Sequence, residues 1–319
     1  MKKLLYLFLF GGIIFSAGCT QQTDEEDKDV EEDLSVIEPE AFGEVLLAGE
    51  YKRIYEWMSD EFKAEVSGRE LKKLGQSFNE GVTSYNMLSE VPFEERATLY
   101  TWADDAEEKG LVVVMDDDGM IEGLQLLPLS DAHDSDDVYT ETVFDLPFED
   151  EWFVFWGGTN ALTNYHYEHE NQRYAYDFMQ MKDKRSFAGD KEKNESYYAF
   201  GQPYLASADG TVVAVENNIA DNEPVGESNE EEPLGNHVII DHGNDEFSYL
   251  AHFKEGSIDV TEGDDVTRGD VLGQVGNSGN SSEPHIHFHV ADSADPYTSK
   301  SIRIQLEVGD LVQGDTINN

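Results

Sequence analysis

The chain has 319 residues, a length that suggests two domains, and its 39% hydrophobic content is enough to form real cores. It carries 68 acidic residues against 21 basic ones, a formal net charge of −47. This balance argues against nucleic-acid binding, which needs a basic surface, and gives no electrostatic help in approaching anionic lipid or cell wall. It is typical of a solvated acidic surface or of adaptation to high salt, where like charges are screened.

The first 18 residues predict a secretory signal peptide. Lys2 and Lys3 are followed by an apolar run, residues 4–17, which is shorter than the roughly 20 residues of a spanning helix. The run ends before Cys19, the only cysteine of the chain, so no intrachain disulfide can form. This end resembles a bacterial lipobox, although Ser16 stands where that motif usually has leucine. The resemblance implies a lipid anchor on Cys19 at the outer face of the cytoplasmic membrane; the alternative is ordinary cleavage and secretion.

Residues 19–37 predict a disordered acidic tether, because closely spaced aspartates and glutamates repel one another and bury nothing.

Residues 38–130 predict an α+β domain. Apolar residues recur at helical spacing between Phe42 and Met58, and Ser67 with Glu70 forms a capping-box pattern. Strand-like runs follow at 82–92, 96–103, 110–115 and 120–127. Helices followed by an antiparallel sheet resemble the small cone-shaped domains related to nuclear transport factor two. We expect a spacer or targeting module, with a binding pocket as the alternative.

Residues 131–137 are polar and acidic and predict a linker. From residue 138 to residue 319 the chain is rich in strand patterns and turn residues, without a long amphipathic helix, so we expect an all-β antiparallel-sheet domain. Residues 221–233 predict an exposed polar loop within it.

The segment PHIHFHV, residues 284–290, carries the strongest chemical signal. Its alternation predicts a strand, and strand side chains alternate faces, so His285 and His287 point the same way. Eight of the nine histidines lie between His166 and His289, which places the site in one domain. Two other segments add candidates: NYHYEHENQRYAYDF with His166, His169 and Asp177, and YLAHF with His252. A catalytic zinc takes three nitrogen or oxygen ligands and leaves one open position, which two histidines and one carboxylate satisfy.

The second half of the chain resembles the lysostaphin-type, or LytM-like, zinc metalloendopeptidases. The resemblance lies in SADGTVVAV (207–215), GNHVIIDHGN (235–244), YLAHF (249–253) and VTRGDVLGQVGNSGNSSEPHIHF (266–288). It implies a zinc-dependent endopeptidase that hydrolyses peptides of bacterial peptidoglycan in cross-links or stems, with one Zn²⁺ per chain at the floor of a β-sheet groove. We expect a monomer whose partners are peptidoglycan peptides and, through Cys19, the lipid bilayer.

Carried over residue by residue, the resemblance implies that His166, Asp177 and His287 bind zinc and that His252 and His285 are the catalytic pair. One of the pair accepts a proton from water and the other stabilises the developing oxyanion. The family commonly separates its first histidine and aspartate by only three residues, whereas His166 and Asp177 are eleven positions apart. A related branch with Asn-Tyr-His and Gln-Arg-Tyr-Ala-Tyr-Asp has this longer spacing, and His169 is the rival first ligand.

The other histidines have weaker signals. His289 shares the face of His285 and His287 and predicts a supporting or structural role, whereas His237 and His242 are interpreted as structural. Arg173 could meet a substrate carboxylate or form a surface salt bridge.

Two alternative functions stay open. A zinc-free relative could activate another wall hydrolase, although all five site positions are filled here. VTRGDVLGQVGNSG also resembles the hairpins of lipoyl and biotinyl carrier domains, but residues 255–299 contain no lysine to carry the group.

Overall fold

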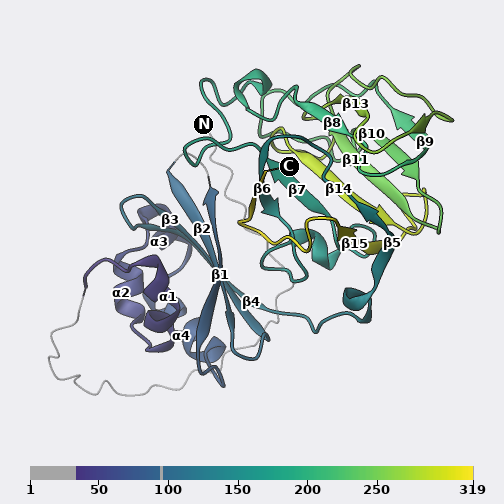
Figure 1. The fold of residues 1–319 in the computed structure, drawn as a ribbon. Helices are drawn as coiled ribbons and strands as arrows, with labels where there is room; N and C mark the ends of the chain where they lie inside the picture. The colour runs from purple at the N-terminus through teal and green to yellow at the C-terminus, as the bar shows by residue number, and fades with distance from the viewer. Residues whose placement is uncertain (1–33, 94–95, 319) are drawn as a thin grey trace, which may run out of the picture. The chain divides into compact units, whose positions relative to one another are not determined.

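The computed structural model describes residues 34–93 and 96–318 (Figure 1). The predicted signal peptide, the lipid-anchor cysteine and most of the predicted tether fall in residues 1–33, outside the described residues. In the part of the chain that is described, no helix is long and apolar enough to cross a membrane.

Short helices form the first described part. A 3-10 turn η1 (Pro39–Ala41) is followed by α1 (Phe42–Leu47), α2 (Tyr51–Glu56), α3 (Asp60–Glu65) and α4 (Gly68–Phe78). The helical pattern after Phe42 is interrupted at Gly49, whose positive φ of 78° suits a helix end. The predicted capping box of α4 is confirmed, because the Ser67 side chain accepts from the Glu70 amide while the Glu70 carboxylate accepts from the Ser67 amide.

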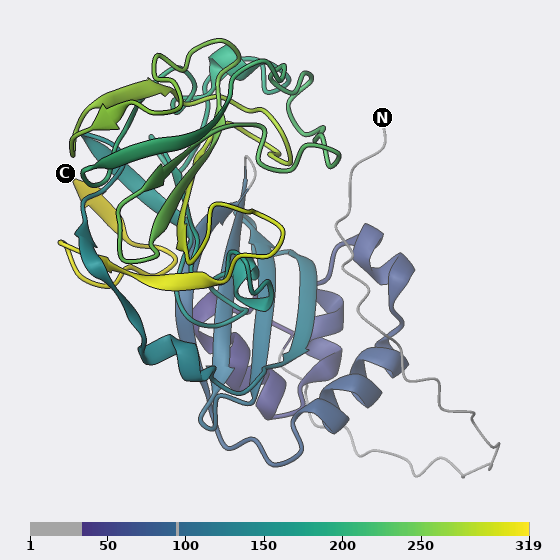
Figure 2. The same cartoon turned by 90° about the vertical axis from the view of Figure 1, so that its right-hand side faces the viewer.

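A four-stranded antiparallel sheet follows the helices. Its strands are β1 (Tyr85–Phe93), β2 (Ala97–Asp104), β3 (Lys109–Asp116) and β4 (Ile121–Pro128), paired in sequence order. Figure 2 shows the helices on one face of this sheet. The core between them contains Phe42 and Ile54 from the helices with Trp102 and Val113 from the strands. This part therefore has the predicted α+β arrangement.

The remainder is built almost entirely from strands. The strands are β5 (Tyr139–Phe144), β6 (Glu151–Trp156), β7 (Tyr176–Met179), β8 (Pro203–Leu205), β9 (Gly210–Glu216), β10 (Asn236–Asp241), β11 (Phe247–Phe253), β12 (Asp265–Val266), β13 (Val271–Gln274), β14 (Ile286–Ala291), β15 (Ser301–Leu306) and β16 (Thr316–Asn318). The main sheet has the order β12-β9-β10-β11-β14-β7-β6-β16, and β8 pairs with β13. All described pairs are antiparallel except β15 with β5. The predicted all-β class is confirmed.

Strand β14 lies near the middle of the large sheet, between β11 and β7 (Figure 1). Its even-numbered residues Ile286, Phe288 and Val290 are fully buried in the main hydrophobic core. Its odd-numbered residues therefore face the opposite side of the sheet, as strand alternation requires. The apolar face of β14 thus holds its histidine face in a fixed position.

Two segments that composition describes only as polar have local structure. The predicted linker contains a 3-10 turn, η2 (Asp134–Asp137), whose Asp136 side chain is buried. The predicted exposed loop 221–233 is partly packed at its start. Asp221 Oδ1 accepts from the Asn277 amide at 2.7 Å, and the Asn222 side chain donates to the carbonyls of Gly279 and Ser281. These contacts join segments far apart in sequence, which composition does not reveal. The domain boundaries at residues 130 and 138 stay predictions.

Candidate metal centre

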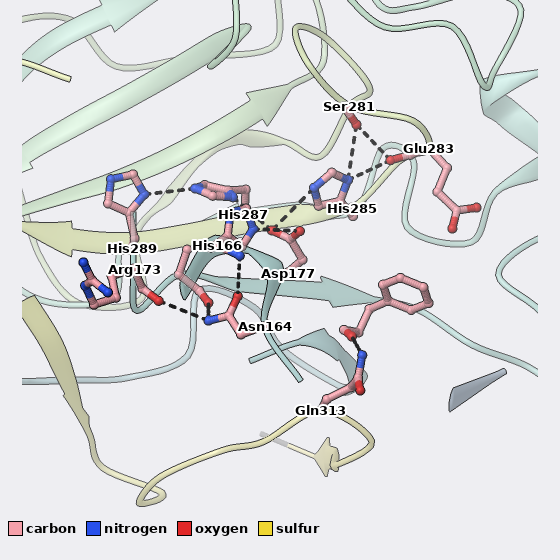
Figure 3. Close-up of polar contacts among 12 residues, drawn as sticks. Asn164, His166, Arg173, Asp177, Ser281, Glu283, His285, His287, His289 and Gln313 are labelled. Carbon is pink, nitrogen blue, oxygen red and sulfur yellow. Dashed lines mark hydrogen bonds and ion pairs between the residues drawn. The ribbon is translucent and has the colours of Figure 1, made fainter. Parts of the chain in front are cut away.

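Asp177 and His287 face each other across two neighbouring strands. They are direct partners in the antiparallel register of β7 and β14, so their side chains leave the same face of the sheet. His287 Nδ1 lies 2.9 Å from Asp177 Oδ1 (Figure 3). This pair is fixed by the sheet itself.

His166 reaches the same point from outside the sheet. It lies in the 3-10 turn η3 (Tyr165–Glu168), and its Nε2 is 3.1 Å from Asp177 Oδ2 (Figure 3). Asn164 shapes this turn: its Oδ1 accepts from the His166 amide, and its Nδ2 donates to the carbonyls of Gly158, Arg173 and Ala175. One buried amide therefore ties both ends of the 165–175 loop together, so His166 and Asp177 meet despite their separation in sequence.

The three residues make a donor set that suits zinc. The ligand atoms of His166, Asp177 and His287 all lie within 4.8 Å of one another, and each residue is at most 4% exposed. Two imidazole nitrogens and one carboxylate oxygen are ligands that zinc accepts. Among the described residues, the ion-pair partners of Asp177 are the three imidazoles of His166, His285 and His287. A buried carboxylate without lysine or arginine fits a bound cation.

Electrostatics in this cluster favour an ionised carboxylate. Burial acts to raise the pKa of Asp177, but the neighbouring His166 and His285 and the hydrogen bonds from His166 and His287 hold it well below its usual range. Burial lowers the pKa of His287, so this ring is held neutral and its nitrogens can serve as metal ligands. Asp177 is thus ionised and His287 neutral, the net charges that these side chains carry as metal ligands.

His252 and His285 present equivalent ring atoms to the site. His285 Nδ1 is 2.8 Å from the Glu283 carbonyl oxygen and 3.2 Å from Ser281 Oγ; His252 Nδ1 is 2.8 Å from the Ser278 carbonyl oxygen. Because a carbonyl oxygen only accepts, both Nδ1 atoms carry hydrogen, and Nε2 is the ring atom of each that is left for proton transfer. His285 Nε2 lies 3.6 Å from Asp177 Oδ1, and the two rings are 4.9 Å apart. Either Nε2 can accept a proton and then donate a hydrogen bond.

His252 has an unusual backbone conformation. Its φ is +65°, which is rare for a residue other than glycine and costs on the order of 1–3 kcal/mol. The register between β10 and β11 shifts beside it, between Asn236 and Val238, as in a β-bulge. Its amide donates to the Leu234 carbonyl and its own carbonyl accepts from Gly276, so neighbouring chain holds the strained conformation. The bulge turns the ring toward His285.

His289 contacts a predicted ligand directly. Its Nδ1 is 2.9 Å from His287 Nε2, the ring atom on the far side from Asp177 (Figure 3). The ring stacks on Tyr249, its cross-strand partner, with centroids 4.5 Å apart. His289 therefore orients His287, which agrees with the supporting role predicted for it. The His166 ring lacks such support: its Nδ1 is buried without a hydrogen-bond partner among the described residues.

The remaining candidates lie elsewhere. His169 is exposed and does not join the cluster, so the structure favours His166 over its rival. His237 Nδ1 contacts the Gly235 carbonyl and His242 contacts the Asp209 carbonyl and Ser248 Oγ, consistent with structural roles. Among the described residues Arg173 has no ion pair, so the predicted surface salt bridge is not seen: its guanidinium donates to the Tyr167 carbonyl and lies over the Tyr167 ring. Contact of Arg173 with a substrate carboxylate stays a prediction. Sequence reasoning also missed the anchoring function of Asn164, although it stands in the Asn-Tyr-His pattern.

The buried imidazoles predict acid sensitivity of the metal-free protein. Burial lowers the pKa of His237, His242 and His252 below 6.5, so these rings stay neutral in the folded state while the unfolded chain binds protons. Stability is therefore fully present above pH of about 6.5 and should fall as pH drops toward 5. We expect a lower urea midpoint at pH 5.5 than at pH 7.5, measured with chelator and with salt to screen the acidic surface. An equal or higher midpoint at pH 5.5 would contradict this expectation.

The fold and the site together define a class. A carboxylate and an imidazole on neighbouring antiparallel strands, a second imidazole from an adjacent turn and two further imidazoles beside them form the arrangement expected of a metal-dependent hydrolase. The model of peptidase family M23 matches residues 196–299, so the chain contains a peptidase M23 domain of the lysostaphin or LytM type. The match includes His252, His285 and His287, whereas His166 and Asp177 precede it.

The chain is also similar to individual known proteins. The chain is 30% identical over 106 residues to the peptidoglycan DD-endopeptidase ShyA of Vibrio cholerae, which covers 33% of this chain and 21% of that protein. It thus spans about a fifth of the length of this curated relative. The catalytic domain of lysostaphin from Staphylococcus simulans is 19% identical, covering 48% of this chain and 88% of that one, with a TM-score of 0.27. A putative peptidase M23 from Pseudomonas aeruginosa is 17% identical, covering 69% and 81%, with a TM-score of 0.31.

Proposed function

We propose that this protein is a zinc-dependent endopeptidase that hydrolyses peptide bonds in bacterial peptidoglycan. The observation that carries the proposal is the convergence of His166 Nε2, the Asp177 carboxylate and His287 Nδ1, with ligand atoms no more than 4.8 Å apart. His252 and His285 flank this point with their Nε2 atoms. The match to peptidase family M23 and the similarity to a peptidoglycan DD-endopeptidase support the substrate class.

The residues of the site have separate roles in amide hydrolysis. A zinc ion held by His166, Asp177 and His287 would supply a Lewis acid that polarises the scissile carbonyl and acidifies water. Nε2 of one of the pair His252 and His285 accepts the proton of the attacking water. Nε2 of the other donates a hydrogen bond to the oxygen on which negative charge develops. The Nδ1–H groups of His252 and His285 bind the carbonyls of Ser278 and Glu283, which fixes the orientation of both rings.

The experiment that tests this function uses purified protein and defined cell walls. Peptidoglycans with direct and with glycyl cross-links are digested, and the released fragments are identified by mass spectrometry. We expect new amino and carboxyl ends within peptides, intact glycan bonds and about one zinc per chain by elemental analysis. A protein that holds no zinc and releases no fragments, yet stimulates another wall hydrolase, would instead be the zinc-free regulator.

We also propose that the protein is anchored through lipidated Cys19 on the outer face of the cytoplasmic membrane. This proposal rests on the sequence Ala17-Gly18-Cys19 after an apolar run, which lies outside the described residues. In a bacterial host, wild-type protein should fractionate with membranes and be released by detergent but not by salt. Cys19→Ser should shed the protein or leave it uncleaved, as seen by immunoblotting of each fraction. Recovery of all wild-type protein in the medium would reject the anchor.

A further inference from the structure

The loop between the first two predicted ligands is held at both ends by one residue of η2. The loop spans residues 165–175, with His166 near its start and Asp177 just after its end. Asp136 Oδ2 accepts from the Tyr167 hydroxyl at 2.6 Å, and Asp136 Oδ1 accepts from the Tyr174 hydroxyl at 2.7 Å. Tyr167 directly follows His166, and Tyr174 lies three positions before Asp177. A single carboxylate therefore contacts both ends of the loop.

Asp136 is itself fixed. Its backbone carbonyl accepts from Arg303 Nη1 on β15 at 2.6 Å, and its Oδ2 also accepts from the His133 amide at 2.8 Å. The side chains of Asp136, Tyr167 and Tyr174 are 9%, 2% and 3% exposed. The His133 ring packs on Tyr167 with centroids 5.2 Å apart. Because η2 is secured to the sheet, the loop is secured through Asp136 as well.

The charge state of Asp136 suits this contact. Burial acts to raise its pKa, but the hydrogen bonds from Tyr167 and Tyr174 outweigh burial and lower it. Burial together with Asp136 raises the pKa of Tyr174 to about 12, so that hydroxyl keeps its proton to donate. Hydrogen bonds to an ionised acceptor are about twice as strong as neutral ones, and here they are shielded from water. The three side chains thus form a strong buried clamp.

We propose that Asp136 is a positioning residue for the metal site, which holds His166 and Asp177 at their binding separation through the hydroxyls of Tyr167 and Tyr174. The proposal rests on the proposed metal-dependent function. A loop that is free to open would have to be ordered each time the metal binds. The loss of conformational entropy would then weaken metal binding. The Asn164 side chain closes the loop by binding backbone carbonyls at its far end, whereas Asp136 fixes the closed loop to the sheet. Asn164 therefore restricts opening of the loop, and Asp136 restricts movement of the whole loop relative to the sheet.

The test measures the dissociation constant for Zn²⁺ of the purified protein by competition with a chromophoric chelator. Asp136→Asn keeps the shape but removes the charge, and we expect Zn²⁺ to bind roughly tenfold more weakly or worse, the range typical of residues behind metal ligands. Tyr167→Phe and Tyr174→Phe should each weaken binding less, and combining either with Asp136→Asn should add little. These two variants keep the test valid if Asp136→Asn does not fold.

Asp104→Asn is the matched control. Asp104 is also a buried carboxylate, 4% exposed, but its Oδ1 accepts from the amides of Glu108 and Lys109 in the α+β part. It should alter stability without altering the Zn²⁺ dissociation constant. Equal Zn²⁺ affinity in wild type, Asp136→Asn, Tyr167→Phe and Tyr174→Phe would overturn the proposed role of Asp136 alone. A wild-type protein that binds no Zn²⁺ would overturn the proposed function itself.

Discussion

His287→Ala is expected to lose both zinc and peptidase activity, whereas His285→Ala is expected to keep most of the zinc and lose activity by roughly 10²–10⁴-fold. The difference follows from the two ring positions. His287 Nδ1 lies 2.9 Å from the Asp177 carboxylate inside the three-residue cluster. His285 Nε2 stands further off, at 3.6 Å, and its Nδ1 is engaged by the Glu283 carbonyl. Removing a ligand empties the site, whereas removing a proton acceptor leaves the ligands in place.

Zinc content by elemental analysis and fragment release from peptidoglycan measure the two effects separately. His242→Ala serves as the matched control, because His242 directly follows β10 and hydrogen-bonds the Asp209 carbonyl and Ser248 instead of the cluster. It should retain zinc and activity in whatever fraction folds. Equal zinc loss in His285→Ala and His287→Ala would show that the roles of the pair are wrongly assigned.

Alternation on β14 could be predicted from sequence because it depends only on local geometry. A run of apolar residues at even positions and histidines at odd positions permits one orientation once the even side chains enter the core. The partners of that face could not be predicted in the same way. The register that sets His287 against Asp177 joins strands more than a hundred residues apart, and it depends on the pairing of the whole sheet.

Local departures from regular structure limited the prediction of the rest of the site. The alternating pattern of β11 does not show that a bulge and a positive φ turn His252 toward His285. The spacing between His166 and Asp177 shows that the chain between them must fold back as a loop, but it does not show that Asn164 closes this loop. These features arise from side chains that bind backbone groups of distant segments. The periodicity of residue types along the sequence therefore does not predict them.

Asp136 illustrates the same limit for a charged residue. Four acids in a short polar segment, 131–137, predict a solvated linker, because composition treats them alike. In the structure, one of them is buried and receives hydrogen bonds from Tyr167 and Tyr174, while neighbouring Asp134 and Asp137 are exposed. Only the tertiary partners distinguish the buried acid from the solvated ones. Acidic linkers next to metal sites therefore need structural inspection before they are taken as spacers.

Zinc is expected to raise the melting temperature of the wild-type protein and not that of Asp177→Asn. A ligand that binds only the folded state stabilises it by RT ln(1 + [L]/Kd), about 4 kcal/mol at a free concentration of 1,000 Kd. For a domain of this size class, that corresponds to roughly 8–16 °C. Asp177 supplies the carboxylate of the cluster and is 4% exposed, so its neutral amide would leave two imidazoles without an anionic ligand.

The acidic surface makes Asp177→Asn the necessary reference. With a net charge of −47, exposed carboxylates will also attract Zn²⁺ weakly, and such binding is common to both proteins. The difference between their zinc-induced shifts therefore isolates the His166–Asp177–His287 cluster. Differential scanning calorimetry with and without zinc, at fixed pH and salt, gives the two shifts. Asp104→Asn should show the full wild-type shift, because its buried carboxylate lies outside the cluster. If Asp177→Asn gained as much as the wild type, the zinc would be bound elsewhere and the cluster would not be the metal site.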